Sequence, residues 1–289
     1  MQLELFFLAL LSAFLFALAL VLTRFGLESR SPLAGAAISI PTTALLFVII
    51  APFMVDFNHW HAEAVYLFAV AGVFFPVAVT LLTFASNRRV GPTLTGTFGN
   101  LTPLFAVGLA VILVGDVPTP MQWLGISVIV FGVCILFFDG PVATRTWPLW
   151  ALLLPIAAAL LRGLVQPVVK LGLEVWPNPL AAATIGYIVS TAVVLMLHIL
   201  RHTKSAPGNG SGGWWFSLVG ICNGGAVLSL YAALARGPVA LVAPLVATYP
   251  LAVLVLERVL VGRAAAITLA GLAGIGAIIC GVVVLVGSR

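Results

Sequence analysis

The sequence predicts an all-α integral membrane protein, with ten transmembrane helices arranged as two inverted five-helix repeats around a central cavity. Composition is the first observation: 62% of the 289 residues are hydrophobic and 7% are charged, whereas ordinary globular domains carry about 25% charged residues. The second is that the apolar residues form runs near the ~20 residues with which a helix crosses a bilayer. The third is that short motifs of the first half recur, in the same order, in the second half.

Polar and Pro/Gly-rich breaks divide the apolar runs into the expected helices. The first run, residues 5–22, is too long for the core of a signal peptide and no polar mature domain follows it, so we take it as the first membrane helix. The longest connection, residues 201–213, is polar and glycine-rich and is expected to be a flexible surface loop. The ten expected helices span residues 3–24, 33–54, 63–86, 92–114, 120–138, 148–171, 178–200, 214–235, 238–257 and 265–286.

Five motifs recur at a spacing of 146 or 147 residues, which supports two repeats, at residues 1–140 and 147–289. The matched positions are Arg24-Phe25-Gly26-Leu27-Glu28 with Lys170-Leu171-Gly172-Leu173-Glu174, Pro32-Leu33-Ala34 with Pro179-Leu180-Ala181, Gly91-Pro92 with Gly237-Pro238, Pro103-Leu104 with Pro250-Leu251, and Leu113-Val114-Gly115 with Leu260-Val261-Gly262. Because each half has an odd number of helices, the second half must be inserted upside down relative to the first. Inverted repeats of this kind place the substrate site near the midplane, between the repeats.

These features resemble the ten-helix members of the drug/metabolite transporter superfamily, in its EamA-like group. The resemblance covers the whole chain and rests on the five-plus-five repeat, the cation-x-Gly-Leu-Glu ends of helices 1 and 6, the basic Gly-Pro starts and internal Pro-Leu of helices 4 and 9, and the glycine-rich helices 5 and 10. Bacterial relatives include exporters of amino acids and related metabolites, so the resemblance implies that kind of activity. Relatives that favour aromatic substrates tend to carry tryptophan in helices 4 and 6. Here those regions contain Asn100 and Arg162, which argues against a dedicated aromatic substrate.

The cations give the expected placement in the membrane. Nine Lys and Arg residues lie in the loops after helices 1, 3, 5, 7 and 9, and three lie on the opposite side. The positive-inside rule therefore places both termini outside, whereas relatives commonly place both in the cytoplasm. We expect a multi-pass protein of the inner (plasma) membrane of a bacterium. Its expected partners are the lipid bilayer and a small-molecule substrate, with no nucleic acid; the oligomeric state is left open, with a monomer favoured.

Arg162 is the sharpest single signal, because it lies near the middle of helix 6, where a charge costs about +2.5 to +3.5 kcal/mol on insertion scales. Gln166 and Lys170 follow at i+4 and i+8, so all three share one helix face. Arg162 and Gln166 are the expected ligands of a substrate carboxylate. The repeat spacing places Phe16 at the equivalent position of the first half, so the charge breaks the symmetry. The alternative is that Arg162 snorkels to a headgroup or binds a backbone carbonyl at a helix break.

Helix 4 carries the expected ligands of a substrate ammonium. Thr97 and Asn100 lie on one face, and Thr102 and Pro103 follow. Because proline has no backbone N–H, Pro103 marks a hinge or helix break and leaves a carbonyl near Gly99 without its usual donor. The alternative is that the threonines and glycines only pack helices together.

Helix 9 contains the corresponding set, Thr248, Tyr249 and Pro250, with Pro250 as a second hinge or break. Tyr249 either roofs the cavity or packs with its hydroxyl bonded. Thr80 in helix 3 and Asn223 in helix 8 are weaker substrate-binding candidates, since each is a single polar group in an apolar run.

No catalytic residue, cofactor or metal site is expected. The four histidines lie at helix ends or in loops, and the three cysteines lie in apolar runs without metal-ligand spacing. The central parts of the expected helices contain no Asp or Glu, the residues that proton-coupled transporters commonly use. This favours facilitated diffusion over proton coupling.

The favoured function is a secondary transporter that exports small zwitterionic metabolites, amino acids above all, by alternating access. One alternative is an exporter of organic cations or drugs, which an unpaired arginine in the cavity would repel. A passive pore is another. In a different class, a membrane enzyme acting on a lipid-linked substrate would need acid/base groups at the interface. Only Asp56, His59, His61 and Glu63 gather there, without metal or nucleophile spacing.

Overall fold

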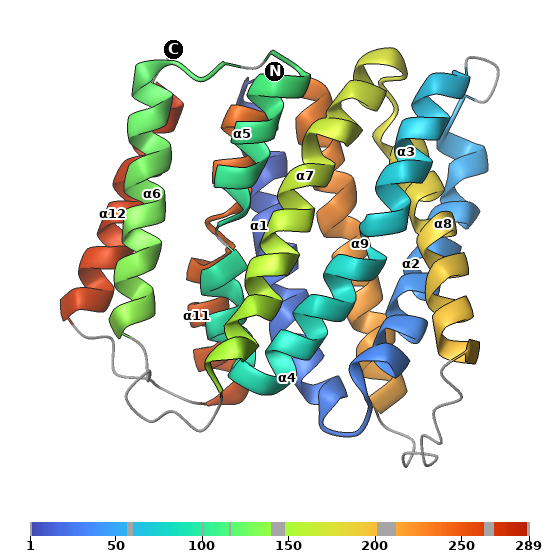
Figure 1. The fold of residues 1–289 in the computed structure, drawn as a ribbon, viewed down its shortest axis with the longest axis horizontal. Helices are drawn as coiled ribbons and strands as arrows, with labels where there is room; N and C mark the ends of the chain where they lie inside the picture. Colours follow the sequence, from blue (N-terminus) through green and yellow to red (C-terminus); the bar gives the residue numbers. More distant parts are fainter. Residues whose placement is uncertain are drawn as a thin grey trace.

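The computed structural model describes residues 2–56, 60–99, 101–115, 117–139, 148–200, 212–262 and 269–287, and within these ranges the chain forms helices and no strand (Figure 1). The first half contains α1 (Gln2–Leu27), α2 (Pro32–Met54), α3 (Ala62–Phe74), α4 (Val77–Gly99), α5 (Thr102–Leu113) and α6 (Pro120–Asp139). The second half contains the short 3-10 helix η3 (Leu149–Leu152), α7 (Leu153–Val175), α8 (Pro179–Leu200), α9 (Gly212–Arg236), α10 (Val239–Val246), α11 (Tyr249–Val261) and α12 (Leu269–Gly287). The connection between the expected repeats, residues 140–147, and most of the expected flexible loop, residues 201–211, lie outside the described residues.

The described helices account for ten membrane spans. Seven segments are long and apolar enough to cross a bilayer: Leu3–Leu27, Pro32–Met54, Ala62–Pro92, Leu149–Val175, Pro179–Leu200, Gly212–Arg236 and Val239–Leu260. The shorter apolar helices Thr102–Leu113, Pro120–Gly132 and Leu269–Gly281 belong to the other three. Helix α1 begins and α12 ends at the same end of the bundle (Figure 1), as an even number of spans requires. The predicted membrane fold is confirmed.

The third span is divided, although the sequence analysis expected one continuous helix there. Helix α3 ends at Phe74 and α4 begins at Val77, with Pro76 between them, because proline supplies no N–H and its ring obstructs the preceding turn. The chain then stays helical past the expected end as far as Gly91. The backbone of Gly91 has φ of 84°, a region that favours glycine, and Pro92 starts the fourth span.

The fourth and ninth spans are interrupted at equivalent places. Helix α5 begins at Thr102 and α11 begins at Tyr249, 147 residues later, each with a proline in its first turn. The Thr102 hydroxyl donates to the Gly99 carbonyl (2.6 Å), and the Thr248 hydroxyl donates to the Leu245 carbonyl (2.7 Å). An unsatisfied carbonyl in hydrocarbon costs several kcal/mol, so these hydroxyls stabilise the two breaks.

The starts of α2 and α8 use the same chemistry in both halves. The Ser31 hydroxyl oxygen accepts from the Ala34 N–H at 3.2 Å, and the Asn178 side-chain oxygen accepts from the Ala181 N–H at 2.9 Å. Both residues are therefore N-caps, and each is followed by a proline that is preorganised for the first helical position. The recurring Pro-Leu-Ala motif marks helix starts.

The two halves pack together through pairs of contacts that the repeat relates. Thr43 of α2 donates to the carbonyl of Gly220 in α9, and Ser190 of α8 donates to the carbonyl of Gly72 in α3. Gly72 permits the close approach, because a Cβ there would lie 2.7 Å from the Gly186 carbonyl oxygen. Each contact reappears with the roles of the halves exchanged, which is the signature of a pseudo-two-fold axis.

The cation-x-Gly-Leu-Glu motif also has a packing function. Phe216 of α9 lies against Gly26 of α1, and Phe68 of α3 lies against Gly172 of α7. Phe216 and Phe68 are almost fully buried, at 0% and 1% exposed. The glycine in each copy of the motif therefore makes room for one aromatic ring of the other half.

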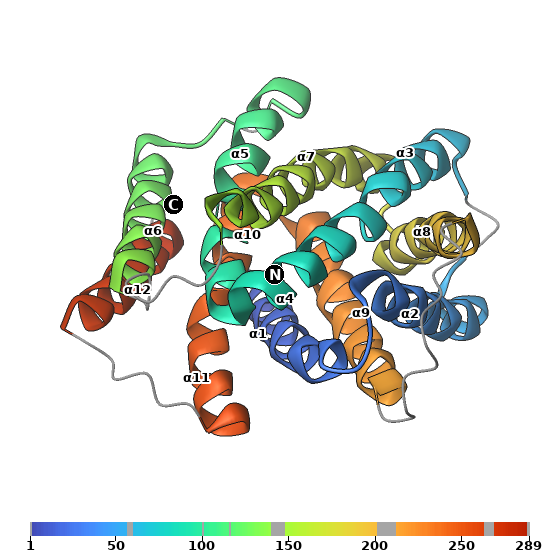
Figure 2. The same ribbon diagram turned by 60° about the horizontal axis from the view of Figure 1, so that its bottom comes forward.

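Helices α6 and α12 form a pair at one edge of the bundle and pack mainly on each other (Figures 1 and 2). A Cβ at Gly132 would lie 2.7 Å from the Gly274 carbonyl oxygen, and one at Gly281 would lie 2.8 Å from the Gly125 carbonyl oxygen. Small residues at such crossings let helix backbones approach closely in lipid. The other spans surround the centre of the molecule (Figure 2).

We expect Gly72→Ala to lower the melting temperature of the purified protein in detergent, because overpacking costs about 1–3 kcal/mol. Gly220→Ala should do the same at the equivalent contact. Gly108→Ala and Gly276→Ala are matched controls, since no atom lies within 4 Å of a Cβ at either position. The controls should be neutral or slightly stabilising, because alanine is the better helix former. Equal melting temperatures for all four variants would show that the close approach is not required.

Candidate functional site

A cavity opens between the two halves at the centre of the bundle. The space between its lining atoms, counting the open space at its mouth, is about 510 Å³. Helices α1, α4, α7, α8, α9 and α11 supply its walls. Four residues singled out in the sequence line it: Thr80, Arg162, Asn223 and Tyr249.

Arg162 supplies the only charged side chain among the lining residues that the structure describes. Its guanidinium carbon lies 5.5 Å from the centroid of the Phe16 ring, and Tyr249 lines the same cavity. The Nε atom is buried and has no partner among the described residues. A guanidinium offers five N–H donors in a planar fork that suits a carboxylate, so the cavity contains a donor set suited to an anion.

Arg162 lies close to the pseudo-two-fold axis. It occupies the position in the second half that Phe16 occupies in the first, 146 residues earlier, and the two side chains contact each other. Two positions that a two-fold operation exchanges can touch only near the axis of that operation. The unmatched charge is therefore at the interface of the halves rather than on one side of it.

Five aromatic rings line the cavity together with Arg162. They belong to Phe16 of α1, Phe75 between α3 and α4, Phe84 of α4, Tyr187 of α8 and Tyr249 of α11, and each residue is less than 10% exposed. Of these rings, only Tyr249 was expected at the site from the sequence, because the others stand in apolar runs with nothing to distinguish them from ordinary packing residues.

Several expected substrate-binding residues lie elsewhere. Thr102 and Thr248 are at the helix breaks, where their hydroxyls are bonded to backbone carbonyls, and neither lines the cavity. Gln166 is buried in the helix packing at 3% exposed, and its Oε1 has no partner among the described residues. Asn100 and the side chain of Thr97 lie outside the described part of the chain.

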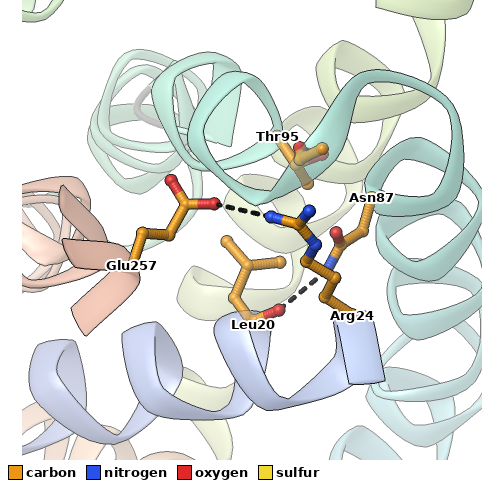
Figure 3. A network of polar contacts seen from close by, with 6 residues as sticks. Leu20, Arg24, Asn87, Thr95 and Glu257 are labelled. Carbon is orange, nitrogen blue, oxygen red and sulfur yellow. Dashed lines mark hydrogen bonds and ion pairs between the residues drawn. The ribbon is translucent and has the colours of Figure 1, made fainter. Parts of the chain in front are cut away.

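A polar network closes the bundle next to this cavity (Figure 3). Thr23 lines the cavity, and its neighbour Arg24 forms an ion pair with Glu257 of α11, with 3.9 Å between Nη1 and Oε1. The Asn87 amide donates to the Leu20 carbonyl at 2.7 Å and so ties α4 to α1. Helices of both halves are thus connected by polar bonds at this end.

Helix α4 carries a second part of the network, across its kink at Gly91. The hydroxyls of Ser86 and Thr95 are 2.7 Å apart, and Thr95 donates to the Gly91 carbonyl at 2.7 Å. Figure 3 includes Thr95 among the residues of this network. These residues were missed in the sequence, because Ser86-Asn87 directly precedes Arg88-Arg89 and resembles an ordinary polar helix end.

The opposite end lacks an equivalent ion pair between the halves around Lys170, among the described residues. Lys170 is the counterpart of Arg24, and it donates to the Leu234 carbonyl at 3.0 Å and lies 3.7 Å from Glu174 of its own helix. The residue equivalent to Glu257 is Ala110. The polar contacts of these two cations therefore differ between the two ends of the bundle, although the backbone repeats.

The arginines that precede the two Gly-Pro motifs also make different contacts in the two halves. Arg236 pairs with Glu4 of α1 at 2.9 Å, whereas Arg89 stacks on Trp150 of η3, with 4.4 Å from its guanidinium carbon to the ring centroid. Trp150 stands 146 residues after Glu4. Each half thus holds the start of the other half's first span, by charge in one case and by a cation–π contact in the other.

The candidate enzyme cluster does not join the cavity. Asp56, His61 and Glu63 are exposed at the connection between α2 and α3, and His59 lies outside the described residues. Within the described ranges, no group of three or more His, Cys, Asp or Glu side chains is arranged to hold a metal ion.

We expect Glu257→Gln to loosen the end of the cavity that Arg24 closes. A partly exposed pair of this kind is worth about 1 kcal/mol or less, so the labelling rate of a cysteine at Thr23 should rise about two- to fivefold. The measurement uses a membrane-impermeant thiol reagent on protein whose native cysteines have been replaced.

Glu174→Gln is the matched control, since it removes the same charge at the other end and should leave the labelling rate unchanged. Exchanging the charges, with Arg24→Glu and Glu257→Arg together, should restore slow labelling. Unchanged labelling in Glu257→Gln would contradict a closing role for the ion pair.

Comparison with known proteins agrees with this architecture. A model of the EamA-like transporter family matches residues 5–138 and 149–287. Among solved structures, one described only as the crystal structure of a protein superposes with a TM-score of 0.73 at 19% sequence identity, covering 97% of this chain and 94% of that chain. At this identity the superposition shows a shared fold. No curated protein matches the chain. Because the family model spans both halves, the chain belongs to the EamA-like transporter family, within the drug/metabolite transporter superfamily.

Proposed function

We propose that this transporter exports small zwitterionic metabolites, amino acids above all, from a bacterial cell across the inner membrane by alternating access. The observation that carries the proposal is the position of Arg162. It places a half-buried guanidinium, whose buried Nε has no partner among the described residues, in a cavity between two inverted halves. Every amino acid presents a carboxylate of matching geometry.

Alternating access is supported by the combination of repeats and closures. The backbone contacts repeat between the halves, so a second arrangement with their roles exchanged uses the same packing. The ion pairs between the halves differ, with Arg24–Glu257 at one end and Arg236–Glu4 at the other. An alternating-access cycle opens the two ends in turn, and each end has its own bonds to break.

Organic cations are the second candidate substrate and are disfavoured by the same residue. A cation in the cavity meets the charge of Arg162, and no acidic side chain is among the described lining residues. Cation–π contacts with the surrounding rings favour a cation, but they are weaker than repulsion between two unit charges in a partly desolvated site.

We expect Arg162→Gln to lose most saturable amino-acid flux. A charge-assisted hydrogen bond contributes about 1.5–3 kcal/mol, which corresponds to about ten- to hundredfold in affinity. The measurement is counterflow of a panel of radiolabelled amino acids in proteoliposomes, with and without an imposed proton gradient. The gradient should have no effect if transport is facilitated diffusion.

Arg258→Gln is the matched control, since Arg258 is exposed at the end of α11 and its loss should leave flux unchanged. Arg162→Lys keeps the charge without the fork and should retain part of the flux. Wild-type flux in Arg162→Gln would eliminate the carboxylate role, and the absence of flux for every amino acid in the wild type would eliminate the substrate class.

A further inference from the structure

We infer that the cavity recognises the carboxylate and an apolar body of its substrate and does not require the ammonium group, so that hydrophobic monocarboxylates without an amino group are also ligands. This inference rests on the proposed function, because it concerns the same site, and it widens the substrate class from amino acids to apolar organic anions.

The charges in and around the cavity favour an anion. Arg162 supplies a formal positive charge to the cavity, and no carboxylate lies among the described lining residues. The acidic side chains for which the structure describes an ion pair lie near helix ends, where Glu4 pairs with Arg236, Glu174 with Lys170 and Glu257 with Arg24. A bound monoanion neutralises the site, whereas a zwitterion brings a second positive charge close to the guanidinium.

An ammonium group needs hydrogen-bond acceptors. The helix breaks near Pro103 and Pro250 expose carbonyls, which are the acceptors expected from the sequence. In the structure the Thr102 hydroxyl bonds the Gly99 carbonyl and the Thr248 hydroxyl bonds the Leu245 carbonyl. One carbonyl at each break is therefore already bonded by the protein itself.

The other lining groups offer an ammonium only neutral partners. Thr23 donates its hydroxyl to the Ala19 carbonyl at 2.7 Å, within its own helix. Thr80, Thr83 and Asn223, with the hydroxyls of Tyr187 and Tyr249, are the other neutral polar side chains of the lining. They can solvate an amino group, but they provide no countercharge for it, so the ammonium contributes little to selection.

The rest of the lining is suited to an apolar body. The rings of Phe16, Phe75 and Phe84 are joined by aliphatic groups such as Leu20 and Val227. Their burial means that a bound hydrocarbon group replaces water against apolar surface, a favourable exchange that grows with the area covered. These three rings belong to α1, to α4 and to the link between α3 and α4. They lie outside the fourth and sixth expected helices, residues 92–114 and 148–171, in which relatives that favour aromatic substrates tend to carry tryptophan.

Binding to the purified full-length protein in detergent, measured by titration calorimetry, tests this inference with four probes. We expect 3-phenylpropionate to bind within about threefold of L-phenylalanine. Phenethylamine, which has the same ring and no carboxylate, should bind at least about tenfold more weakly. Propionate, which lacks the ring, should also be at least about tenfold weaker. Comparable affinity for phenethylamine, or for propionate, or no saturable binding of 3-phenylpropionate, would overturn the inference.

Two variants test whether 3-phenylpropionate binds in this cavity. Arg162→Gln should weaken 3-phenylpropionate at least about tenfold, whereas the matched Arg258→Gln should not. Phe16→Leu should weaken 3-phenylpropionate more than propionate, a ratio that a general loss of folding does not produce. An unchanged affinity in Arg162→Gln would contradict the site.

The outcomes separate this inference from the proposed function. If 3-phenylpropionate binds as expected and proteoliposomes carry no amino acid, the proposed function fails and the inference stands. If amino acids are carried and 3-phenylpropionate does not bind, the inference fails and the proposed function stands.

Discussion

The structure depends on one constraint: backbone polar groups in hydrocarbon must be satisfied by the protein, because no water is present there. Continuous helices meet this constraint without help, yet two of the spans that line the cavity are broken, the third between α3 and α4 and the ninth between α10 and α11. The two breaks that the repeat relates are stabilised by the hydroxyls of Thr102 and Thr248. Thr43 and Ser190 bond glycine carbonyls across helix contacts in the same way. Hydroxyl groups that resemble binding residues in the sequence are therefore mostly structural, and they make irregular backbone tolerable beside the cavity.

The contacts that repeat between the halves build the scaffold, and the residues that differ between the halves supply the charged contacts. Caps, close glycine contacts and buried rings recur with the halves exchanged. The charge of Arg162 opposite Phe16 does not recur, and neither does the ion pair of Arg24 with Glu257. A symmetric scaffold with two differing closures and a single central charge meets the requirements of a carrier that presents one site to two sides in turn.

The sequence was sufficient for the fold and the family, because hydropathy and the spacing of Gly-Pro and Pro-Leu motifs are local signals. It also indicated Thr80, Arg162, Asn223 and Tyr249, which the structure brings to one cavity, since a polar group in an apolar run is conspicuous. The rings of Phe75, Phe84 and Tyr187 were not recognisable, because an aromatic residue in a membrane helix packs against lipid or protein without any local difference. The network around Asn87 and Glu257 was also missed. Its members lie far apart in the chain, and only the crossing of α1, α4 and α11 brings them together.

The ion pairs between the halves differ at the two ends of the bundle, Arg24 with Glu257 at one and Arg236 with Glu4 at the other, and this difference has a kinetic consequence. Unequal bonds at the two ends make the inward-open and outward-open forms unequal in free energy, so the empty carrier spends more time in one of them. For an uncoupled carrier, microscopic reversibility forbids this bias from producing accumulation. A lower apparent affinity on one side is compensated by a higher maximal rate from that side, and the ratio of the two parameters is the same in both directions. In such an uncoupled carrier, Arg24 and Glu257 would help to set the concentration at which each side saturates, while the substrate gradient alone would set the direction of net flow.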